Sequence, residues 1–224
     1  MGAFVRFYAS SVGAKVVMAA TGLVWSLFLI GHMLGNWQVF QGAAPLNAYA
    51  HFLHTHVAML WTVRTGLVVT FALHVFAASR LTLANQAARP QAYAKKTNIE
   101  AGWASRNMYL TGAMILAFVT YHLLQFTYRV MNPELGGTLD ALGQNDVYSM
   151  VVGGFQIPAI AGAYMAAMVL LGLHLSHGVA SLFQTLGLCH AWKSYTHAFG
   201  LLFAMLVIGG NLAMPVAILA GWIR

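Results

Sequence analysis

Histidines in apolar surroundings are the first sign of chemistry in this sequence, which contains ten histidines among 224 residues. The segments "TGLVWSLFLIGH" (21–32) and "TGAMILAFVTYH" (111–122) each place a histidine eleven residues after a threonine–glycine pair, at the end of an apolar run. An imidazole in such a run is costly unless it has a polar partner or binds a cofactor. Five histidines share this setting: His32, His74, His122, His174 and His177.

The apolar runs that carry these histidines are long enough to cross a membrane. Hydrophobic residues make up 60% of the chain, charged residues 7%, and the mean hydropathy is +0.71, which leaves too few charges to cover a soluble domain. A helix needs about 20 apolar residues to cross the hydrocarbon core. We therefore predict an all-α polytopic membrane protein, a five-helix up-and-down bundle forming one domain (1–224), with spans at 14–39, 57–83, 105–130, 157–183 and 196–222.

The basic residues predict the orientation of these spans, because Lys and Arg are retained on the cytoplasmic side. With a cytoplasmic N-terminus, that side holds eight of them and the other side three. The first span lacks a signal-peptide cleavage site and is expected to remain as an anchor. The cytoplasmic set is Arg6, Lys15, Arg80, Arg89, Lys95, Lys96, Arg106 and Lys193, and the opposite set is Arg64, Arg129 and Arg224. The net charge of +7 then reflects topology and anionic lipid and gives no reason to expect nucleic-acid binding.

The depth of each histidine sorts them into pairs. All lie late in their spans, and neighbouring helices of such a bundle run antiparallel. His32 and His122, on the first and third spans, therefore share one level, whereas His74 and a histidine of the fourth span share the other. His174 and His177 lie three residues apart on one helix face, and the pattern does not decide between them.

Two histidines that face each other at one level provide the ligands of a six-coordinate b-type haem. Two levels predict two haems, separated by about 10–20 Å. A proton relay and hydrogen-bonded packing histidines are the alternatives. Glycines on the same helices would let a porphyrin approach, although they also let membrane helices pack closely: Gly22, Gly31, Gly35, Gly66, Gly112, Gly172 and Gly178. The single cysteine, Cys189, excludes an internal disulfide and a covalently attached haem.

Short motifs occur in a familiar order along nearly the whole chain: "GHMLGN", "NAYAHFLH", "YHLLQF", "DVYSMVV" and "LHLSHGVASLFQTLG". With them the chain resembles the di-haem cytochrome b membrane anchor of B-type succinate:quinone oxidoreductases (succinate dehydrogenase or fumarate reductase, complex II). The resemblance implies a flavoprotein partner with FAD, an iron–sulfur partner, and electron transfer through two haem b groups to or from a quinone, usually menaquinone. It further implies a multi-pass protein of the prokaryotic cytoplasmic (inner) membrane, active only as a subunit, in a complex that can form a higher oligomer.

By position, the resemblance implies that His74 and His177 ligate a proximal haem near the cytoplasm, and that His32 and His122 ligate a distal haem. It thus selects His177 over His174. Three cations at helix ends are implied to neutralise the proximal haem propionates, although cytoplasmic retention explains them equally well: Lys15, Arg106 and Lys193.

The quinone site is expected near the distal haem, in the outer loop before the second span. The groups there that could bond the quinone carbonyls are Asn36, Asn47, Tyr49, His51 and His54, and an ordinary interfacial loop is the alternative. Some relatives use membrane glutamates for proton transfer. Here that function has no counterpart, because the four acids fall in predicted loops: Glu100, Glu134, Asp140 and Asp146.

Two other classes of protein share part of this pattern. One is the cytochrome b anchor of another respiratory enzyme, such as a membrane hydrogenase. The other is a histidine-based proton-coupled transporter, which would normally show helices broken at mid-membrane or an inverted repeat. The Thr–Gly-to-His repeat relates spans that point the same way, so it is not inverted. The sequence does not predict the direction of electron flow or the quinone species.

Overall fold

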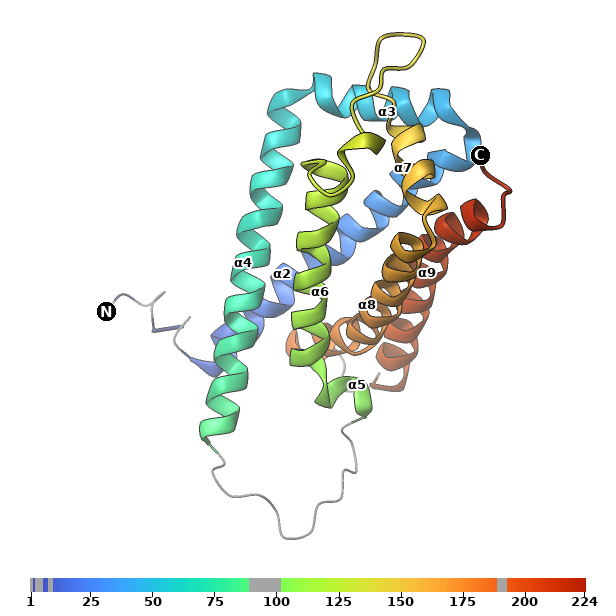
Figure 1. Cartoon of the computed structure of the whole chain (residues 1–224). Coiled ribbons are helices and arrows are strands. Elements are labelled where there is room, and N and C mark those ends of the chain that lie inside the picture. The colour runs from blue at the N-terminus through green and yellow to red at the C-terminus, as the bar shows by residue number, and fades with distance from the viewer. Residues whose placement is uncertain (1, 3–5, 8–9, 89–101, 189–192) are drawn as a thin grey trace. The chain divides into compact units, whose positions relative to one another are not determined.

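The computed structural model describes residues 2, 6–7, 10–88, 102–188 and 193–224, the side chain of Lys193 excepted. These residues form helices and loops, with no β-strand among them. Five helical segments are long and apolar enough to span a membrane (Figure 1). They are α2 (Ser11–Asn36) with the 3₁₀ helix η1 (Trp37–Gln41), α4 (Val57–Ala87), α6 (Met108–His122) with the π-helix η2 (Leu123–Thr127), α8 (Pro158–Thr185) and α9 (Lys193–Leu219). The predicted all-α class with five apolar helices is confirmed.

Two compact units make up the chain, and each long helix contributes one part to each unit. Unit 1 comprises Met1–Leu27, Thr65–Ala113 and Leu173–Ala204, and unit 2 comprises Phe28–Arg64, Met114–Gly172 and Met205–Arg224. The short helix α5 (Trp103–Arg106) belongs to unit 1.

Glycine and proline mark the helix ends. Pro158 begins α8, where its missing N–H removes no helical hydrogen bond. Beyond the ends of α8 and α9, Gly187 and Gly221 adopt φ values of 73° and 75°, the left-handed conformation that commonly terminates a helix. These signals explain why the spans stop where they do.

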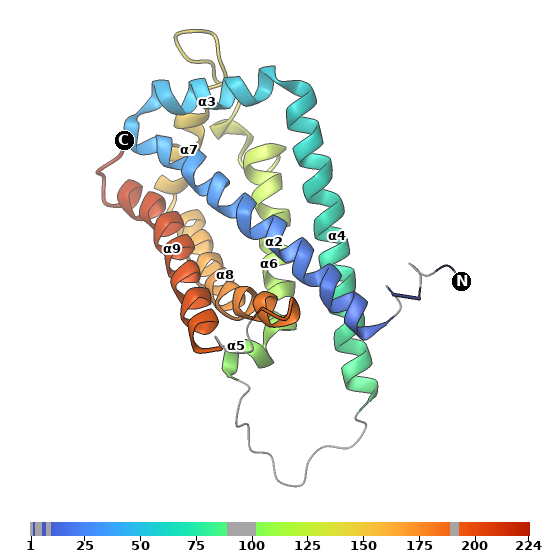
Figure 2. The same cartoon turned by 180° about the vertical axis from the view of Figure 1, so that it is seen from behind.

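Small residues allow α9 to approach its neighbours closely. In unit 1, a Cβ on Gly200 would lie 2.7 Å from the Ser176 carbonyl oxygen of α8. In unit 2, a Cβ on Gly210 would overlap Met33, and the Gly210 carbonyl accepts a hydrogen bond from Trp37 Nε1 at 2.8 Å. Helices α8 and α9 run side by side in both views (Figures 1 and 2). Such close backbone approach is how membrane helices gain packing energy without a hydrophobic driving force.

Two further helices lie in unit 2, where loops were expected: α3 (Ala43–Thr55) and α7 (Val147–Gln156), which contact each other. The prediction of an outer loop over "NAYAHFLH" is therefore wrong in its secondary structure. Both helices are too short to be found as spans, and α3 mixes polar and apolar residues without a long apolar run. Glu134 lies in the short 3₁₀ helix η3 (Pro133–Leu135).

Asn47 joins these two helices through a buried polar network. Its side chain is 1% exposed; Nδ2 donates to Asp140 Oδ2 at 3.2 Å and to Asp146 Oδ1 at 3.1 Å, and Oδ1 accepts from the Tyr148 N–H at 2.9 Å. Asp146 also caps α7 by accepting from the Ser149 N–H at 3.0 Å. Desolvation acts to raise the pKa of Asp146, but the hydrogen bonds from Ser149 and Asn47 outweigh it and hold the pKa below its usual value.

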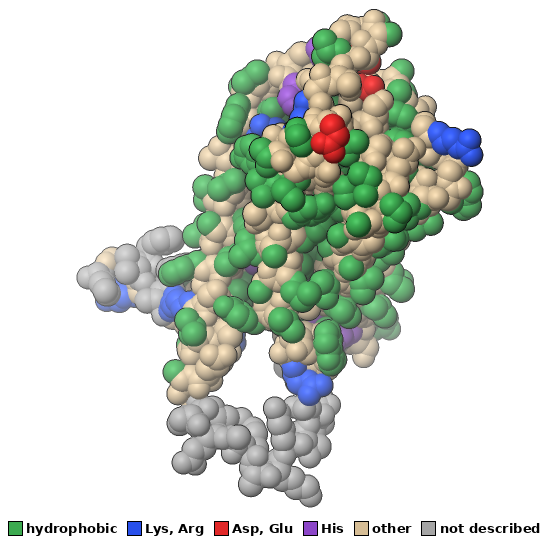
Figure 3. All heavy atoms as spheres, in the orientation of Figure 1, with side chains coloured by type: hydrophobic (Ala, Val, Ile, Leu, Met, Phe, Trp, Pro, Cys, Tyr) green, Lys and Arg blue, Asp and Glu red, His purple; other side chains and the backbone are tan. Residues whose placement is uncertain are grey.

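Apolar side chains cover much of the face shown in Figure 3. Helix α4 exposes many of them, including Trp61, Val68, Phe76 and Leu83, and buries only Ala77. An apolar surface of this kind suits contact with lipid. Arg89, Lys95, Lys96, Glu100 and Cys189 lie outside the described residues, so their predicted positions stay predictions.

Candidate functional site: two pairs of histidines

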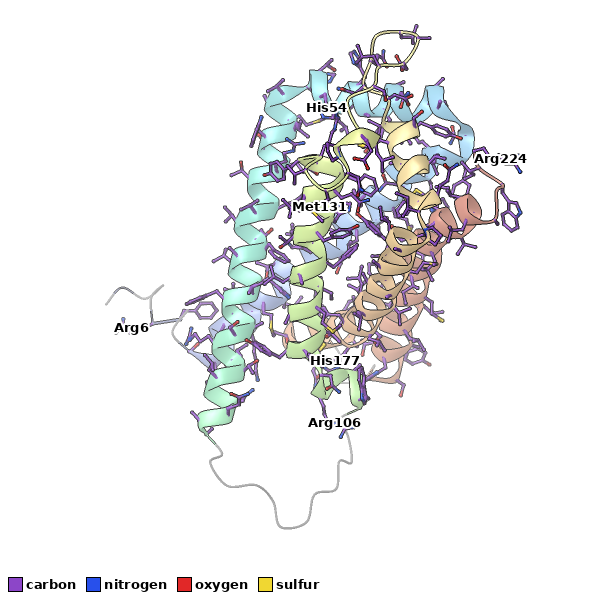
Figure 4. The ribbon with its side chains drawn as sticks, viewed as in Figure 1. Arg6, His54, Arg106, Met131, His177 and Arg224 are labelled. Carbon is purple, nitrogen blue, oxygen red and sulfur yellow. The ribbon has the colours of Figure 1, made fainter. Side chains whose placement is uncertain are left out.

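Unit 1 contains a pair of facing imidazoles, His74 of α4 and His174 of α8. Their ring centres lie 6.4 Å apart with an angle of 62° between the planes. The partner implied by the family resemblance, His177, lies three residues further along α8, which displaces it by about 4–5 Å along the helix and about 60° around it. His177 lies near His197, and Figure 4 shows it at the same end of unit 1 as Arg106. The sequence pattern had left the two histidines open, and the geometry favours His174 as the partner of His74.

Hydrogen bonds fix the tautomer of His74. Its Nδ1 lies 3.1 Å from both Thr21 Oγ1 and the Met18 carbonyl oxygen. A carbonyl can only accept, so Nδ1 must carry the proton and Nε2 keeps a free lone pair. That lone pair is available to a metal ion.

His174 is held in an equivalent way by α6. Its Nδ1 lies 3.1 Å from Thr111 Oγ1, and this hydroxyl is also 3.1 Å from the carbonyl oxygens of Asn107 and Met108. Since the hydroxyl has one proton and two carbonyls to receive it, its oxygen accepts from the imidazole. Here too Nε2 is the free nitrogen.

Unit 2 contains the second pair, His32 of α2 and His122 of α6. Their ring centres lie 5.7 Å apart with an interplanar angle of 87°, so the structure brings together the two histidines that the depth argument paired. Phe28 stacks on His32 at 5.3 Å. The hydroxyl of Tyr164 lies 3.2 Å from His122 Nδ1. Tyr164 was not identified from the sequence, where a phenol within the apolar fourth span was the only signal.

Gln125 is a second side chain that the sequence did not single out. It is 4% exposed and lies in the π-helix η2, three residues after His122. Neither polar atom of its amide has a hydrogen-bond partner among the described residues. A buried amide normally has one, and π-helical turns occur frequently at functional sites.

The two pairs fit bis-histidine ligation of haem iron. Two imidazoles that bind an iron from opposite sides have ring centres about 6 Å apart, given metal–nitrogen bonds of about 2 Å. The observed separations are 6.4 Å and 5.7 Å. Space is also present on α2, since a Cβ on Gly31 would meet no atom within 4 Å. No cluster of three or more His, Cys, Asp or Glu suited to a bare metal ion occurs in the described part of the chain.

The remaining predicted site residues divide between the same two units. Lys15, Arg106 and Lys193 belong to unit 1; Lys15 and Arg106 are exposed, and the side chain of Lys193 lies outside the description. All five predicted quinone residues belong to unit 2.

These five residues differ in surroundings. Asn36 is half-buried at the end of α2, Tyr49 packs so closely that a Cβ on Gly35 would lie 2.7 Å from its ring, and His51 and His54 are exposed on α3. Asn47 differs from the others because its amide is fully used in the network described above. Its geometry gives it a structural role.

Fold and site together define a class: a polytopic all-α membrane protein with two pairs of facing histidines. Comparison of the chain with protein-family models, with curated proteins and with solved structures finds no match.

Proposed function

We propose that this chain is the membrane-anchor, electron-transfer subunit of a succinate:quinone oxidoreductase, and that it carries two b-type haems. One observation carries the proposal: two separate pairs of histidines, each with ring centres about 6 Å apart, occur in a protein of five apolar helices. A packing histidine needs one polar partner, whereas the imidazoles of each pair face one another, and in unit 1 the Nδ1 atoms of His74 and His174 are bonded to other acceptors. The motifs quoted above supply the link to succinate and quinone.

Haem bound between such pairs would supply one-electron transfer across the apolar layer. The chain itself would ligate and orient the haem and exclude water from the iron. His74 and His174 offer Nε2 because their Nδ1 atoms donate to Thr21, Met18 and Thr111. His32 and His122 lie among Phe28, Phe118 and Phe126, an apolar surrounding that keeps water from the metal ligands.

The partners and location follow from the resemblance. We propose that unit 1 faces the cytoplasm and receives electrons from an iron–sulfur subunit, which in turn is reduced by a flavoprotein with FAD. Lys15 and Arg106 in unit 1 would neutralise haem propionates or an acidic partner surface. The protein lies in the cytoplasmic membrane of a prokaryote, with its N-terminus in the cytoplasm.

We propose a quinone site beside the histidine pair of unit 2, the pair that the resemblance implies for the distal haem. Asn36, Tyr49, His51 and His54 remain candidates from the sequence, whereas Asn47 is removed from the set because it holds α3 to α7. Gln125 is added, since its buried amide has an unused donor and an unused acceptor, and a quinone carbonyl accepts a hydrogen bond. The described spans contain no acid, so imidazoles are the groups able to deliver protons near neutrality.

The decisive experiment purifies the full chain with its native partners and records a dithionite-reduced minus air-oxidised spectrum. An α-band of a b-type cytochrome, two haems per chain by pyridine haemochrome, and a co-purifying flavoprotein and iron–sulfur protein are expected. A spectrum without an α-band would refute the proposal. Two haems with a different set of partners, such as hydrogenase subunits, would keep the cytochrome and change the enzyme.

A further inference from the structure

We infer that Thr21 and Thr111 are positioning residues that act on one and the same haem: they hold its two axial histidines in the iron-binding tautomer and set its reduction potential. This inference rests on the proposed function, because it assigns roles toward a haem bound between His74 and His174. It goes beyond that function by assigning two residues, on different helices, to the control of a single potential.

The two threonines have matching surroundings. Each is buried, with 6% of Thr21 and 1% of Thr111 exposed. Each hydroxyl lies 3.1 Å from the Nδ1 of one histidine of the pair and also within 3.1 Å of carbonyl oxygens of its own helix. Each therefore gives its proton to its own backbone and accepts the imidazole proton.

The following glycine completes each contact. A Cβ on Gly22 would lie 3.4 Å from His74 Cε1, and a Cβ on Gly112 would lie 3.5 Å from His174 Cε1. These are ordinary van der Waals distances, so each imidazole edge lies directly against the neighbouring helix beside the hydroxyl. Each Thr–Gly dipeptide thus contacts one imidazole of another helix: Thr21–Gly22 contacts His74, and Thr111–Gly112 contacts His174.

This arrangement explains the repeat that marks the sequence. In both α2 and α6 the Thr–Gly pair lies in unit 1 and binds a histidine there, while the histidine eleven residues later lies in unit 2 and faces its own partner. Each of these helices therefore contributes to both histidine pairs. Eleven residues make about three full helical turns, so the threonine and the histidine lie on nearly the same face of each helix.

The hydrogen bond affects the iron through the imidazole. A proton shared with an acceptor at Nδ1 makes the ring a stronger electron donor, which favours the oxidised iron and lowers the reduction potential. Removing the acceptor should therefore raise the reduction potential. His74 keeps the Met18 carbonyl as a second acceptor at 3.1 Å, whereas Thr111 is the acceptor that the structure gives to His174. Loss of Thr111 should therefore act more strongly than loss of Thr21.

The test uses valine and serine variants of both threonines in the whole complex. Valine keeps the shape of threonine and removes the hydroxyl, whereas serine keeps the hydroxyl. Thr65→Val is the matched control, because Thr65 and Gly66 form a third Thr–Gly pair within α4 that is exposed and has no atom within 4 Å of a Gly66 Cβ. The readouts are haem content and the midpoint potential of each haem, obtained by redox titration of the α-band.

We expect Thr111→Val to raise the potential of one haem by a threefold to tenfold change in its oxidised-to-reduced ratio, about 30–60 mV for a one-electron couple. Thr21→Val should raise the potential of that same haem by less, and both variants should leave the other haem unchanged. The serine variants and Thr65→Val should match the wild type. Loss of one haem in a valine variant, with retention in the serine variant, would also support the inference.

Three outcomes would overturn it: unchanged potentials in both valine variants, shifts in two different haems, or equal loss of haem in the valine and serine variants, which would reveal a packing role only. These are distinct from failure of the proposed function, in which the wild-type complex itself would contain no haem.

Discussion

The choice between His174 and His177 offers the sharpest test of the site geometry. We predict that His174→Ala removes one haem from the complex and that His177→Ala removes none. The reason is distance: His177 lies about 4–5 Å further along α8 and about 60° around it. An imidazole nitrogen must come within about 2 Å of a metal to ligate it, so the two positions cannot substitute for each other without a shift of the helix.

The expected magnitude is a whole haem. Pyridine haemochrome quantification, normalised to chain content, should fall from two per chain to about one in His174→Ala and stay at two in His177→Ala. His174 is also the histidine against which Thr111 and Gly112 pack, so alanine there removes the ligand that these residues hold. The potential of the surviving haem should stay close to its wild-type value, because His32 and His122 belong to the other unit.

His177→Ala serves as the internal control, since both substitutions replace a histidine of the same helix by the same residue. Assembly is checked in each variant by co-purification of the hydrophilic subunits. The reverse result, one haem in His177→Ala and two in His174→Ala with both complexes assembled, would refute the structural reasoning and restore the ligand that the family resemblance implies.

Four further predictions concern unit 2. His122→Ala should remove the haem that His174→Ala leaves, giving one haem per chain by haemochrome, and a loss of both or of neither in an assembled complex would contradict the pairing. Asn47→Ala should destabilise the protein by about 3 kcal/mol in detergent, measured by thermal unfolding, because it breaks three hydrogen bonds, two of them to carboxylates. The contribution of Asp146 to the free energy of unfolding should be fully present above about pH 4, the usual carboxyl pKa. It should be lost as the pH falls through the lowered pKa of Asp146. Asp146→Asn should remove this acid transition, and persistence of the transition in that variant would point to another group. Gln125→Leu should lower quinone turnover while leaving haem content and dye-linked succinate oxidation intact, whereas unchanged quinone kinetics with a raised melting temperature would show that the amide is only a packing defect.

The spans were predictable because the thickness of a bilayer imposes a length on every apolar helix. Depth within those spans was enough to expect His32 opposite His122. Neighbouring helices run antiparallel, so the first and third spans run in the same direction and their late residues lie at the same level. Depth could not separate His174 from His177, because they differ by less than one helical turn. That choice depends on the rotation of α8 about its axis, which no hydropathy pattern records.

Elements that serve polar contacts were harder to predict. Helices α3 and α7 are short, and their stability depends on a side-chain network between segments about 100 residues apart in sequence, Asn47 with Asp146 and Tyr148. Tyr164 and Gln125 stand out only once their neighbours are known, one as a hydrogen-bond partner of His122 and the other as a buried amide without one. Pairings of this kind are properties of the folded chain.

The threonine–glycine pairs show how much of such information a sequence can still carry. In an apolar layer each imidazole N–H needs an acceptor, and the carbonyls of a neighbouring helix are mostly engaged in its own backbone ladder, although the Met18 carbonyl also accepts from His74. A threonine supplies a further acceptor, since its proton returns to its own helix, and the ring lies against that helix beside the next residue, a glycine. Thr65–Gly66 shows that the dipeptide alone is insufficient, because it is exposed and meets no ring. Thr21 and Thr111 differ from Thr65 because a histidine follows each of them eleven residues later. Eleven residues are about three helical turns, so each threonine lies on the same helix face as its histidine. The face that presents His32 or His122 to its partner therefore also presents the threonine to His74 or His174.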